Sequence, residues 1–284
     1  MTPRPPRRRT VDAVILRLWD VGEADRMLSL YSREEGKGRA LAKGVRRPRS
    51  RRAGHLQPLS RTRLLLAQAR SAPIVAQAEA VEVFPALRRD VTRYAYAAQV
   101  AELVERFVWE GEHYPGLFTA LLDALRGVAR EPHPDWPVRF FELRLLDWVG
   151  FRPELHHCTV CGAPIRAEDQ FFSASHGGVV CPRCGTRTPD AQPVNRRTLK
   201  FLRHLQRSTW PEARRVVPDA GVRRALEEVL QAYLTFVLER PLRGAAVQRQ
   251  LRRHAQGPRA AHDAADPAPE APPRGPRSHP EDAP

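Results

Sequence analysis

Four cysteines occur in this chain, as two C-x-x-C pairs with nineteen residues between them: Cys158, Cys161, Cys181 and Cys184. Each pair can direct two thiolates at one metal ion at about 2.3 Å, and two pairs complete the closed tetrahedral shell of a structural zinc site. Gly162 and Gly185 follow the pairs directly and let the chain turn back. The spacing therefore predicts one structural zinc ion bound by the four cysteines.

Other zinc chemistries fit the sequence less well. His156 and His157 precede the first pair, but four thiolates leave no need for a histidine ligand. A zinc deaminase needs an H-x-E motif upstream of a P-C-x-x-C motif, whereas the H-x-E of this chain, at residues 279–281, lies downstream of both pairs. A closed four-sulfur shell also leaves no position for a catalytic water. We expect a structural role for the metal.

The positive charge is concentrated near the N-terminus. The 284 residues have a formal net charge of +15, and residues 1–70 contain eighteen Lys or Arg against six Asp or Glu. This asymmetry predicts a polyanionic partner bound by one domain. No apolar run approaches the length of a membrane span, and thiols poised as metal ligands suit a reducing compartment, so we expect a cytoplasmic protein without membrane contact.

The hydrophobic pattern changes its period near residue 84. Five short runs of period two before that point predict strands over residues 11–18, 27–31, 38–45, 56–67 and 74–83. Five strands in this length fit an OB-type barrel, although an SH3-like barrel or an open meander fits the same pattern. Trp19 and Tyr31, the aromatic residues before Phe84, could stack on bases of a nucleic acid, but a position in the core is favoured for each.

Apolar stripes of helical period follow over residues 94–108, 117–128, 141–149, 198–206 and 222–237. The fold class is therefore predicted as a multidomain α+β protein, in which an N-terminal OB-type β-barrel precedes an all-α domain with an inserted four-cysteine zinc segment. Residues 171–172 and 177–180 predict a small hairpin within the insertion. The expected parts are a flexible basic arm (1–9), the OB domain (10–84), a helical domain (85–153 and 191–253), the zinc insertion (154–190) and a disordered Pro/Ala-rich tail (254–284).

Residues 43–52 carry six positive charges and no negative charge. Folding gains nothing from this density, whereas a phosphate backbone would neutralise the charges and release its counterions. Gly44, Pro48 and Gly54 place the run in a loop between strands. If about six of the cations engaged one strand, affinity would fall by roughly two and a half decades between 50 and 200 mM salt. We expect mainly electrostatic, sequence-independent contact with nucleic acid; the alternative is a solvated surface run that binds nothing specific.

Several of these features together resemble the RecO family of recombination mediators, over roughly residues 10–242. In the barrel region the resemblance rests on residues 22–25 (Gly-Glu-Ala-Asp), 35–38 (Glu-Gly-Lys-Gly), 42–51 (Ala-Lys-Gly-Val-Arg-Arg-Pro-Arg-Ser-Arg) and 56–58 (Leu-Gln-Pro). Downstream it rests on the two cysteine pairs and on residues 145–153 (Leu-Leu-Asp-Trp-Val-Gly-Phe-Arg-Pro) and 172–178 (Phe-Ser-Ala-Ser-His-Gly-Gly). The order and spacing of these pieces carry the resemblance.

The resemblance implies a protein that acts without turnover of a substrate. Similar proteins bind single- and double-stranded DNA, anneal complementary strands, partner RecR and help RecA replace single-strand-binding protein, which is a further candidate partner. On the family pattern, DNA contact is expected at Lys37, Arg39, Lys43, Arg46, Arg47, Arg49, Arg51 and Arg52.

Two rival functions remain open at this stage. A nuclease or metal-dependent hydrolase would need a cluster of carboxylates, but Asp12, Asp20 and Asp25 are interpreted as solvated carboxylates, and neither a phosphate-binding loop nor an H-E-x-x-H motif occurs. A zinc-ribbon transcription or translation factor would share the basic barrel and the four cysteines. An annealing assay separates this second rival from the recombination hypothesis.

Overall fold

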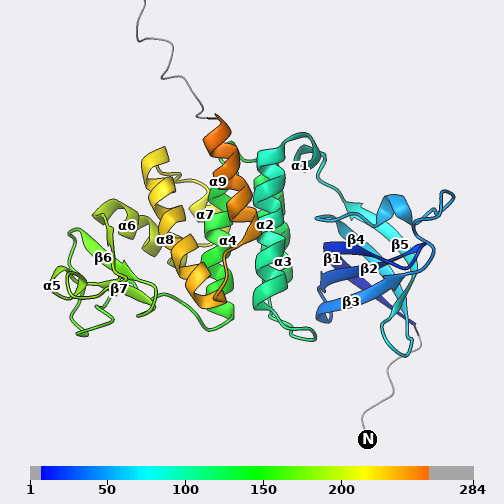
Figure 1. The fold of residues 1–284 in the computed structure, drawn as a ribbon, viewed down its shortest axis with the longest axis horizontal. Coiled ribbons are helices and arrows are strands. Elements are labelled where there is room, and N and C mark those ends of the chain that lie inside the picture. Colours follow the sequence, from blue (N-terminus) through cyan, green and yellow to red (C-terminus); the bar gives the residue numbers. More distant parts are fainter. Residues whose placement is uncertain (1–7, 256–284) are drawn as a thin grey trace, which may run out of the picture.

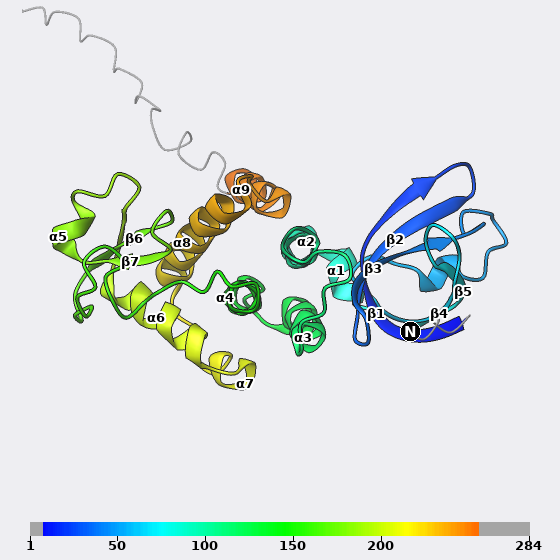
Figure 2. The same ribbon diagram turned by 90° about the horizontal axis from the view of Figure 1, so that it is seen from below.

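The computed structural model describes residues 8–255. A β-barrel lies at one end of the molecule, helices form the middle, and a small sheet with the cysteines lies at the other end (Figure 1). The view from below shows the same order (Figure 2). The arm expected over residues 1–9 lies outside the described residues except for Arg8 and Arg9, which begin the first strand. Of the tail expected over residues 254–284, only the first two residues are described, at the end of α9 (Arg243–Ala255).

The N-terminal domain is a closed barrel with the strand order β1-β2-β3-β5-β4. Its strands are β1 (Arg8–Val21), β2 (Asp25–Ser32), β3 (Gly36–Ala42), β4 (Arg61–Ala67) and β5 (Ile74–Glu82). The pairings are antiparallel except for a short parallel contact between β3 and β5. A closed five-stranded barrel of this order is the OB type, so that prediction is confirmed and the open meander is wrong.

The barrel is filled by the side chains that point inward along each strand. Ile15, Leu28 and Val75 are fully buried there. Tyr31 is also fully buried, as predicted, but it packs with the core of the helical domain. The prediction for Trp19 is wrong, because this half-buried side chain lies on the outward face of β1.

Two predicted strands extend well beyond the observed ones: the strand predicted over residues 38–45 ends at Ala42, and the one predicted over residues 56–67 begins only at Arg61. Leu56 and Leu59 are buried, yet β4 begins only at Arg61, and a short 3₁₀ helix, η1 (Ala53–His55), precedes them. Pro58 has no N–H to donate to a strand ladder, and Leu59 has a left-handed φ of 61°. The apolar residues over positions 56–60 are therefore buried, but they do not form a strand.

The helical domain contains two groups of helices that share one core. The first group is α1 (Pro85–Arg89), α2 (Val91–Phe107), α3 (Leu117–Arg130) and α4 (Asp135–Trp148); the second is α6 (Arg196–Arg207), α7 (Trp210–Ala213), α8 (Ala220–Leu238) and α9. Leu103, Leu125, Leu145 and Leu202 are fully buried in the common core. No helix within residues 8–255 is both long enough and apolar enough to cross a membrane.

The cysteine-containing segment between α4 and α6 forms a three-stranded sheet of order β7-β6-β8 and one helical turn. These elements are β6 (Gln170–Ser173), β7 (Gly178–Val180), β8 (Gln192–Val194) and α5 (Pro182–Gly185). The β6–β7 hairpin confirms the prediction for residues 171–180. The third strand, β8, was not predicted and extends this sheet beyond residue 190.

The barrel joins the helical domain through backbone contacts. The segment after α2 runs along the edge of β3, where the Lys37 N–H donates to Glu112 O (3.0 Å) and the Gly111 N–H donates to Lys37 O (2.8 Å). Gly36 permits this approach, since a Cβ at that position would lie 2.0 Å from Glu112 O and its φ is +71°. Backbone hydrogen bonds along β3 therefore join the two domains directly.

Candidate nucleic-acid interface and metal centre

The basic loop, residues 43–52, is held against the turn between β1 and β2. The Arg46 N–H donates to Ala24 O (3.0 Å), and the Gly44 N–H donates to an Asp25 carboxylate oxygen (2.7 Å). Gly44 has a φ of +65°, which a glycine adopts without strain. These contacts and the buried side chain of Val45 fix the backbone of the loop on the barrel.

Four of the eight predicted DNA contacts have no partner among residues 8–255. The exposed side chains of Lys43, Arg47, Arg49 and Arg51 make no hydrogen bond or ion pair with any described residue. Four positive charges thus lie within nine residues of one loop, unneutralised by the fold. Such a group is arranged to attract a polyanion.

Three other predicted contacts are partnered. Arg46 lies 3.4 Å from Asp20, and Arg39 lies 2.9 Å from Glu110. Both are ion pairs of exposed side chains, which contribute little to stability, and a phosphate could replace the carboxylate. Arg52 is more constrained, because it donates to two backbone carbonyls that tie the loop to the barrel.

Lys37 differs from the other seven. Its half-buried ammonium donates to the carbonyls of Glu105 and Val108 (2.7 Å for the latter), at the C-terminal end of α2. Desolvation lowers the pKa of Lys37, and the nearby charge of Glu105 opposes this effect. A cation at this position satisfies carbonyls that the helix leaves unpaired. The structure places Lys37 at the joint between the barrel and the helical domain.

The sequence analysis missed Arg70. This exposed residue lies in the turn between β4 and β5, and its side chain has no partner among the described residues. The bond from the Leu41 N–H to Pro73 O (2.8 Å) places that turn beside the end of β3, where the basic loop begins. An isolated arginine carries no motif, so only closure of the barrel reveals this position.

The acidic residues weighed as a metal-dependent nuclease site are each bound to other groups. Asp12 accepts two hydrogen bonds from Arg61 Nε, at 2.9 and 3.1 Å, and Asp20 accepts one from Arg26 (2.9 Å). Asp25 anchors the basic loop as described above. Among the described residues, the metal-ligand side chains that gather within reach of one ion are the four cysteines. The carboxylates of the barrel do not form such a group.

The four cysteines meet at one point. Their Sγ atoms all lie within 4.8 Å of one another, and Cys161 Sγ and Cys181 Sγ are 3.8 Å apart. A tetrahedron with metal–sulfur bonds of about 2.3 Å has edges of about 3.8 Å, so the spacing fits a zinc ion. Neither His156 nor His157 belongs to the cluster.

The protonation of the cysteines also suits a cation. Burial raises the pKa of Cys158, but hydrogen bonds from backbone amides, including that of Cys181 (3.3 Å), outweigh it and lower the pKa to about 6. The hydrogen bond with the Cys181 sulfur is the main cause that raises the pKa of Cys184 to about 12. The Cys158 thiol therefore ionises easily, whereas the Cys184 thiol stays protonated. A divalent cation bound between them would favour the thiolate form of Cys184 as well.

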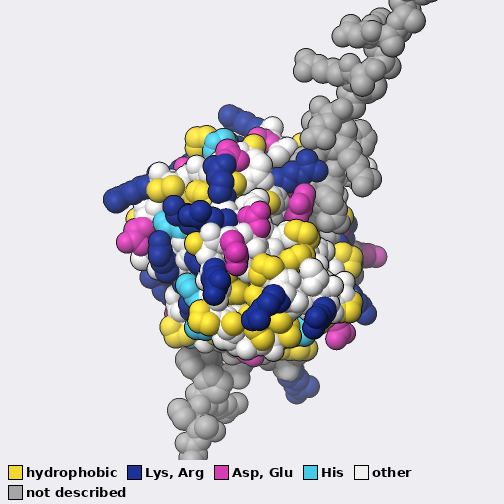
Figure 3. All heavy atoms as spheres, turned by 90° about the vertical axis from the view of Figure 1, so that its left-hand side faces the viewer, with side chains coloured by type: hydrophobic (Ala, Val, Ile, Leu, Met, Phe, Trp, Pro, Cys, Tyr) yellow, Lys and Arg dark blue, Asp and Glu magenta, His cyan; other side chains and the backbone are white. Residues whose placement is uncertain are grey.

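The end of the molecule that carries the cysteines has a mixed surface. Lys and Arg side chains lie there among Asp and Glu and hydrophobic side chains (Figure 3). Helix α6 contributes five basic residues and no acidic residue, but Arg197 pairs with Asp219 (2.7 Å) and Arg203 donates to a backbone carbonyl. Its three other cations, at positions 196, 200 and 207, are exposed. They provide a comparison for the basic loop.

Known proteins match the chain over most of its length. Residues 7–84 match the domain described as "Recombination protein O N terminal", and residues 88–245 match "Recombination protein O C terminal". A DNA repair protein RecO from Desulforudis audaxviator is 42% identical over 246 residues, which are 84% of this chain and 96% of that protein. The chain belongs to the RecO family of DNA repair proteins.

Other RecO proteins agree with this assignment. One from Pelotomaculum thermopropionicum is 42% identical over 239 residues, covering 83% of this chain and 91% of that protein. One from Bifidobacterium adolescentis is 35% identical over 236 residues, covering 82% and 95%. The predicted RecO resemblance is therefore confirmed, and with it a role in DNA repair and recombination. None of the relatives named here is a transcription or translation factor.

Proposed function

We propose that this protein binds single- and double-stranded DNA through the basic loop, anneals complementary strands and, together with RecR, helps RecA replace single-strand-binding protein. Membership of the RecO family supports the repair role. The observation that carries the DNA contact is the set of four cations at positions 43, 47, 49 and 51 that have no partner among residues 8–255. Arg39 and Arg46 can join them when phosphates replace their exposed carboxylate partners.

Annealing in this proposal requires no catalytic group. Two phosphate backbones repel each other over a Debye length of about 8 Å at physiological salt. A loop that neutralises phosphates on both strands raises their local concentration and leaves base edges free to pair. The protein then acts by binding alone, without turnover of a substrate.

The cysteine cluster has a structural part in the same proposal. We assign it one zinc ion, bound by Cys158, Cys161, Cys181 and Cys184, because the sulfur spacing and the thiolate-favouring backbone bonds suit that ion. The closed set of four ligands keeps the two C-x-x-C turns folded. No step of annealing passes through the metal.

The test compares two triple variants that remove equal charge. One replaces Arg47, Arg49 and Arg51 by Ala in the basic loop; the other replaces the exposed cations of α6 (Arg196, Lys200 and Arg207) by Ala. With four phosphate contacts, single-strand affinity of the wild type should fall by about 1.7 decades between 50 and 200 mM salt, and that of the loop variant by only about 0.4. The α6 variant should keep the wild-type slope.

Annealing provides the second measurement. Complementary oligonucleotides coated with single-strand-binding protein should anneal in the presence of the wild type and the α6 variant, and markedly more slowly with the loop variant. Equal losses in the two variants would mean that net charge, and not the loop, carries the contact. Exclusive binding of RNA would favour a zinc-ribbon factor, and strand scission in Mg²⁺ would contradict a non-enzymatic role.

A further inference from the structure

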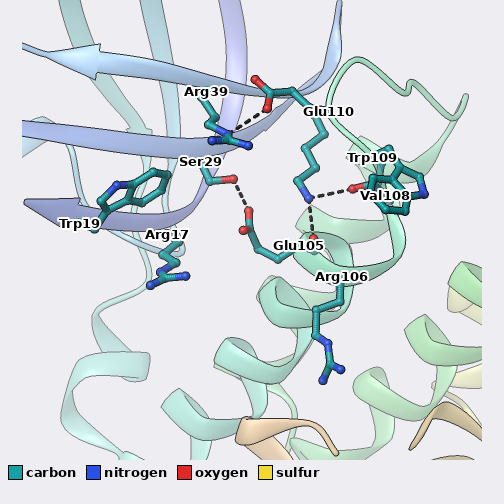
Figure 4. A pocket seen from close by; sticks show the side chains of 10 residues that line it. Arg17, Trp19, Ser29, Arg39, Glu105, Arg106, Val108, Trp109 and Glu110 are labelled. Atoms are coloured by element: carbon teal, nitrogen blue, oxygen red, sulfur yellow. Dashed lines mark hydrogen bonds and ion pairs between the residues drawn. The ribbon is translucent and has the colours of Figure 1, made fainter. Parts of the chain in front are cut away.

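A pocket of about 560 Å³ lies between the outward face of the barrel and the C-terminal end of α2. One wall comes from β1 and β3, and the other from the last turn of α2 and the residues after it. Figure 4 shows Trp19 and Trp109 on opposite sides of this pocket, with Ser29 and Glu105 between them. The walls combine aromatic and cationic side chains with two carboxylates, Glu105 and Glu110, which are bonded to Ser29 and Arg39 respectively. The aromatic and cationic members include Arg17, Trp19, Arg39, Arg106 and Trp109.

Trp19 is held in place on the barrel wall. It pairs across the ladder with Met27, and the guanidinium of Arg17 lies 5.6 Å from the centre of its ring system. This cation–π contact fixes the ring and leaves the charge at the pocket wall. Arg17 has no carboxylate partner among residues 8–255. An unneutralised cation therefore lies next to an aromatic ring.

Trp109 forms the opposite side and is 76% exposed. Its backbone is fixed, because the Trp109 N–H donates to the Glu112 carboxylate (2.7 Å) and the Glu112 N–H donates back to Trp109 O (3.1 Å). Beside the pocket, this exposed ring offers a flat face on which a base can stack. The ring is exposed to solvent while its backbone is held in place.

The pocket is continuous with the basic loop. Strand β3 runs from Arg39, at the pocket, to its end just before Lys43, a distance of about 13 Å at 3.3 Å per residue. Arg39 and Trp19 lie on the same outward face, through the cross-strand pairs of β2. A single strand whose phosphates contact the loop can reach the pocket within the roughly 4–16 nucleotides that one OB domain binds.

We propose that this pocket accepts one unpaired nucleobase of single-stranded DNA, stacked on Trp109, while Arg17 and Trp19 on the opposite wall contact the adjacent nucleotide. The inference rests on the proposed function and adds to it a preference for single over double strands, because a paired base is not available to stack. Only one base of the bound strand is held, so the remaining bases stay free to pair with a complementary strand.

The experiment uses the full chain and two probes of equal length, an oligothymidylate and an abasic oligonucleotide that keeps the phosphates. The wild type should bind the oligothymidylate about tenfold more tightly than the abasic strand. Trp109→Ala and Trp19→Ala should remove most of this difference without changing the salt dependence, whereas Trp109→Phe should keep it. Phe236→Ala, which removes an exposed aromatic ring on α8, is the matched control and should behave as the wild type.

Equal affinities of the wild type for the two probes would overturn the inference. A preference that persists in both Trp→Ala variants would do the same. Neither result touches the proposed function, which depends on the basic loop and is tested by the loop variant. If that variant binds both probes as the wild type does, the proposed function fails independently of the tryptophans.

Discussion

At the scale of single residues, the most unusual feature is a charged pair in the helical core. Arg139 and Glu142 are fully buried, and Arg139 Nη1 lies 3.1 Å from Glu142 Oε2 without forming a hydrogen bond. Gln99 and Gln231 donate to the other oxygen of Glu142 (2.6 and 3.3 Å). Burial raises the pKa of Glu142 to about 7, against the charge of Arg139 and with the repulsion of Glu227. Glu142 therefore holds a proton more tightly in the folded than in the unfolded state.

This pKa predicts how stability depends on pH. The folded value of about 7 exceeds the unfolded 4.5, so the stabilising contribution of Glu142 is complete below pH 4.5 and is lost as the pH rises through 7. Urea unfolding of Glu142→Gln between pH 5 and 8 should show a smaller loss of stability than the wild type. Glu228→Gln, at an exposed position on α8, should keep the wild-type dependence. An unchanged loss in Glu142→Gln would contradict the prediction.

At the scale of elements, the cysteine-containing segment packs against the helical core through only part of its length. Phe172 of β6 stacks edge-on against Tyr233 of α8, with ring centroids 5.6 Å apart. The two C-x-x-C turns lie farther from this contact. The strands and the helical turn next to them contain only three or four residues each. Elements this short do not fold by their own propensity. The zinc ion proposed above would therefore hold them folded.

Zinc removal should therefore unfold part of the segment. After treatment with a chelator, hydrogen exchange should accelerate at residues 156–165 and 181–188, less in β6, and not in the barrel core. Hydrogen exchange with mass spectrometry measures this pattern, and added zinc should restore protection. Unchanged exchange at the two C-x-x-C turns would argue against a structural metal, and a loss of protection throughout the barrel would argue against an independent barrel core.

At the scale of the whole molecule, Lys37 connects the barrel to the helical domain. Replacing it by Met leaves the carbonyls of Glu105 and Val108 without their cation, which should cost about 1–3 kcal/mol of unfolding free energy. Lys43→Met is the matched control, because its exposed side chain has no partner within the described part of the chain. It should weaken DNA binding and leave stability unchanged. Equal stability of the two variants in urea would show that the Lys37 contacts contribute nothing.

The local sequence determined much of this protein. The C-x-x-C spacing predicted a cluster of four sulfurs because each pair turns back within a few residues, and it was correct without knowledge of the fold. The alternating apolar pattern predicted the five strands, although it overextended β4, where Pro58 and the left-handed Leu59 replace strand geometry. The density of charge over residues 43–52 likewise marked the loop. These signals are short-range, so sequence neighbours are enough to read them.

Tertiary structure alone decided which of the predicted cations have partners within the fold. Lys37 and Arg39 find theirs near residues 105–110, far along the chain, whereas Arg47 and Arg49 find none among the described residues. It also decided that Trp19 faces outward, since both faces of β1 carry apolar residues and a shift in register lies between Ile15 and Arg17. The partner that a charged side chain finds, and the face of a strand on which a residue lies, depend on how the barrel closes and how the domains pack together. Those contacts join distant residues, and composition and periodicity carry no record of them.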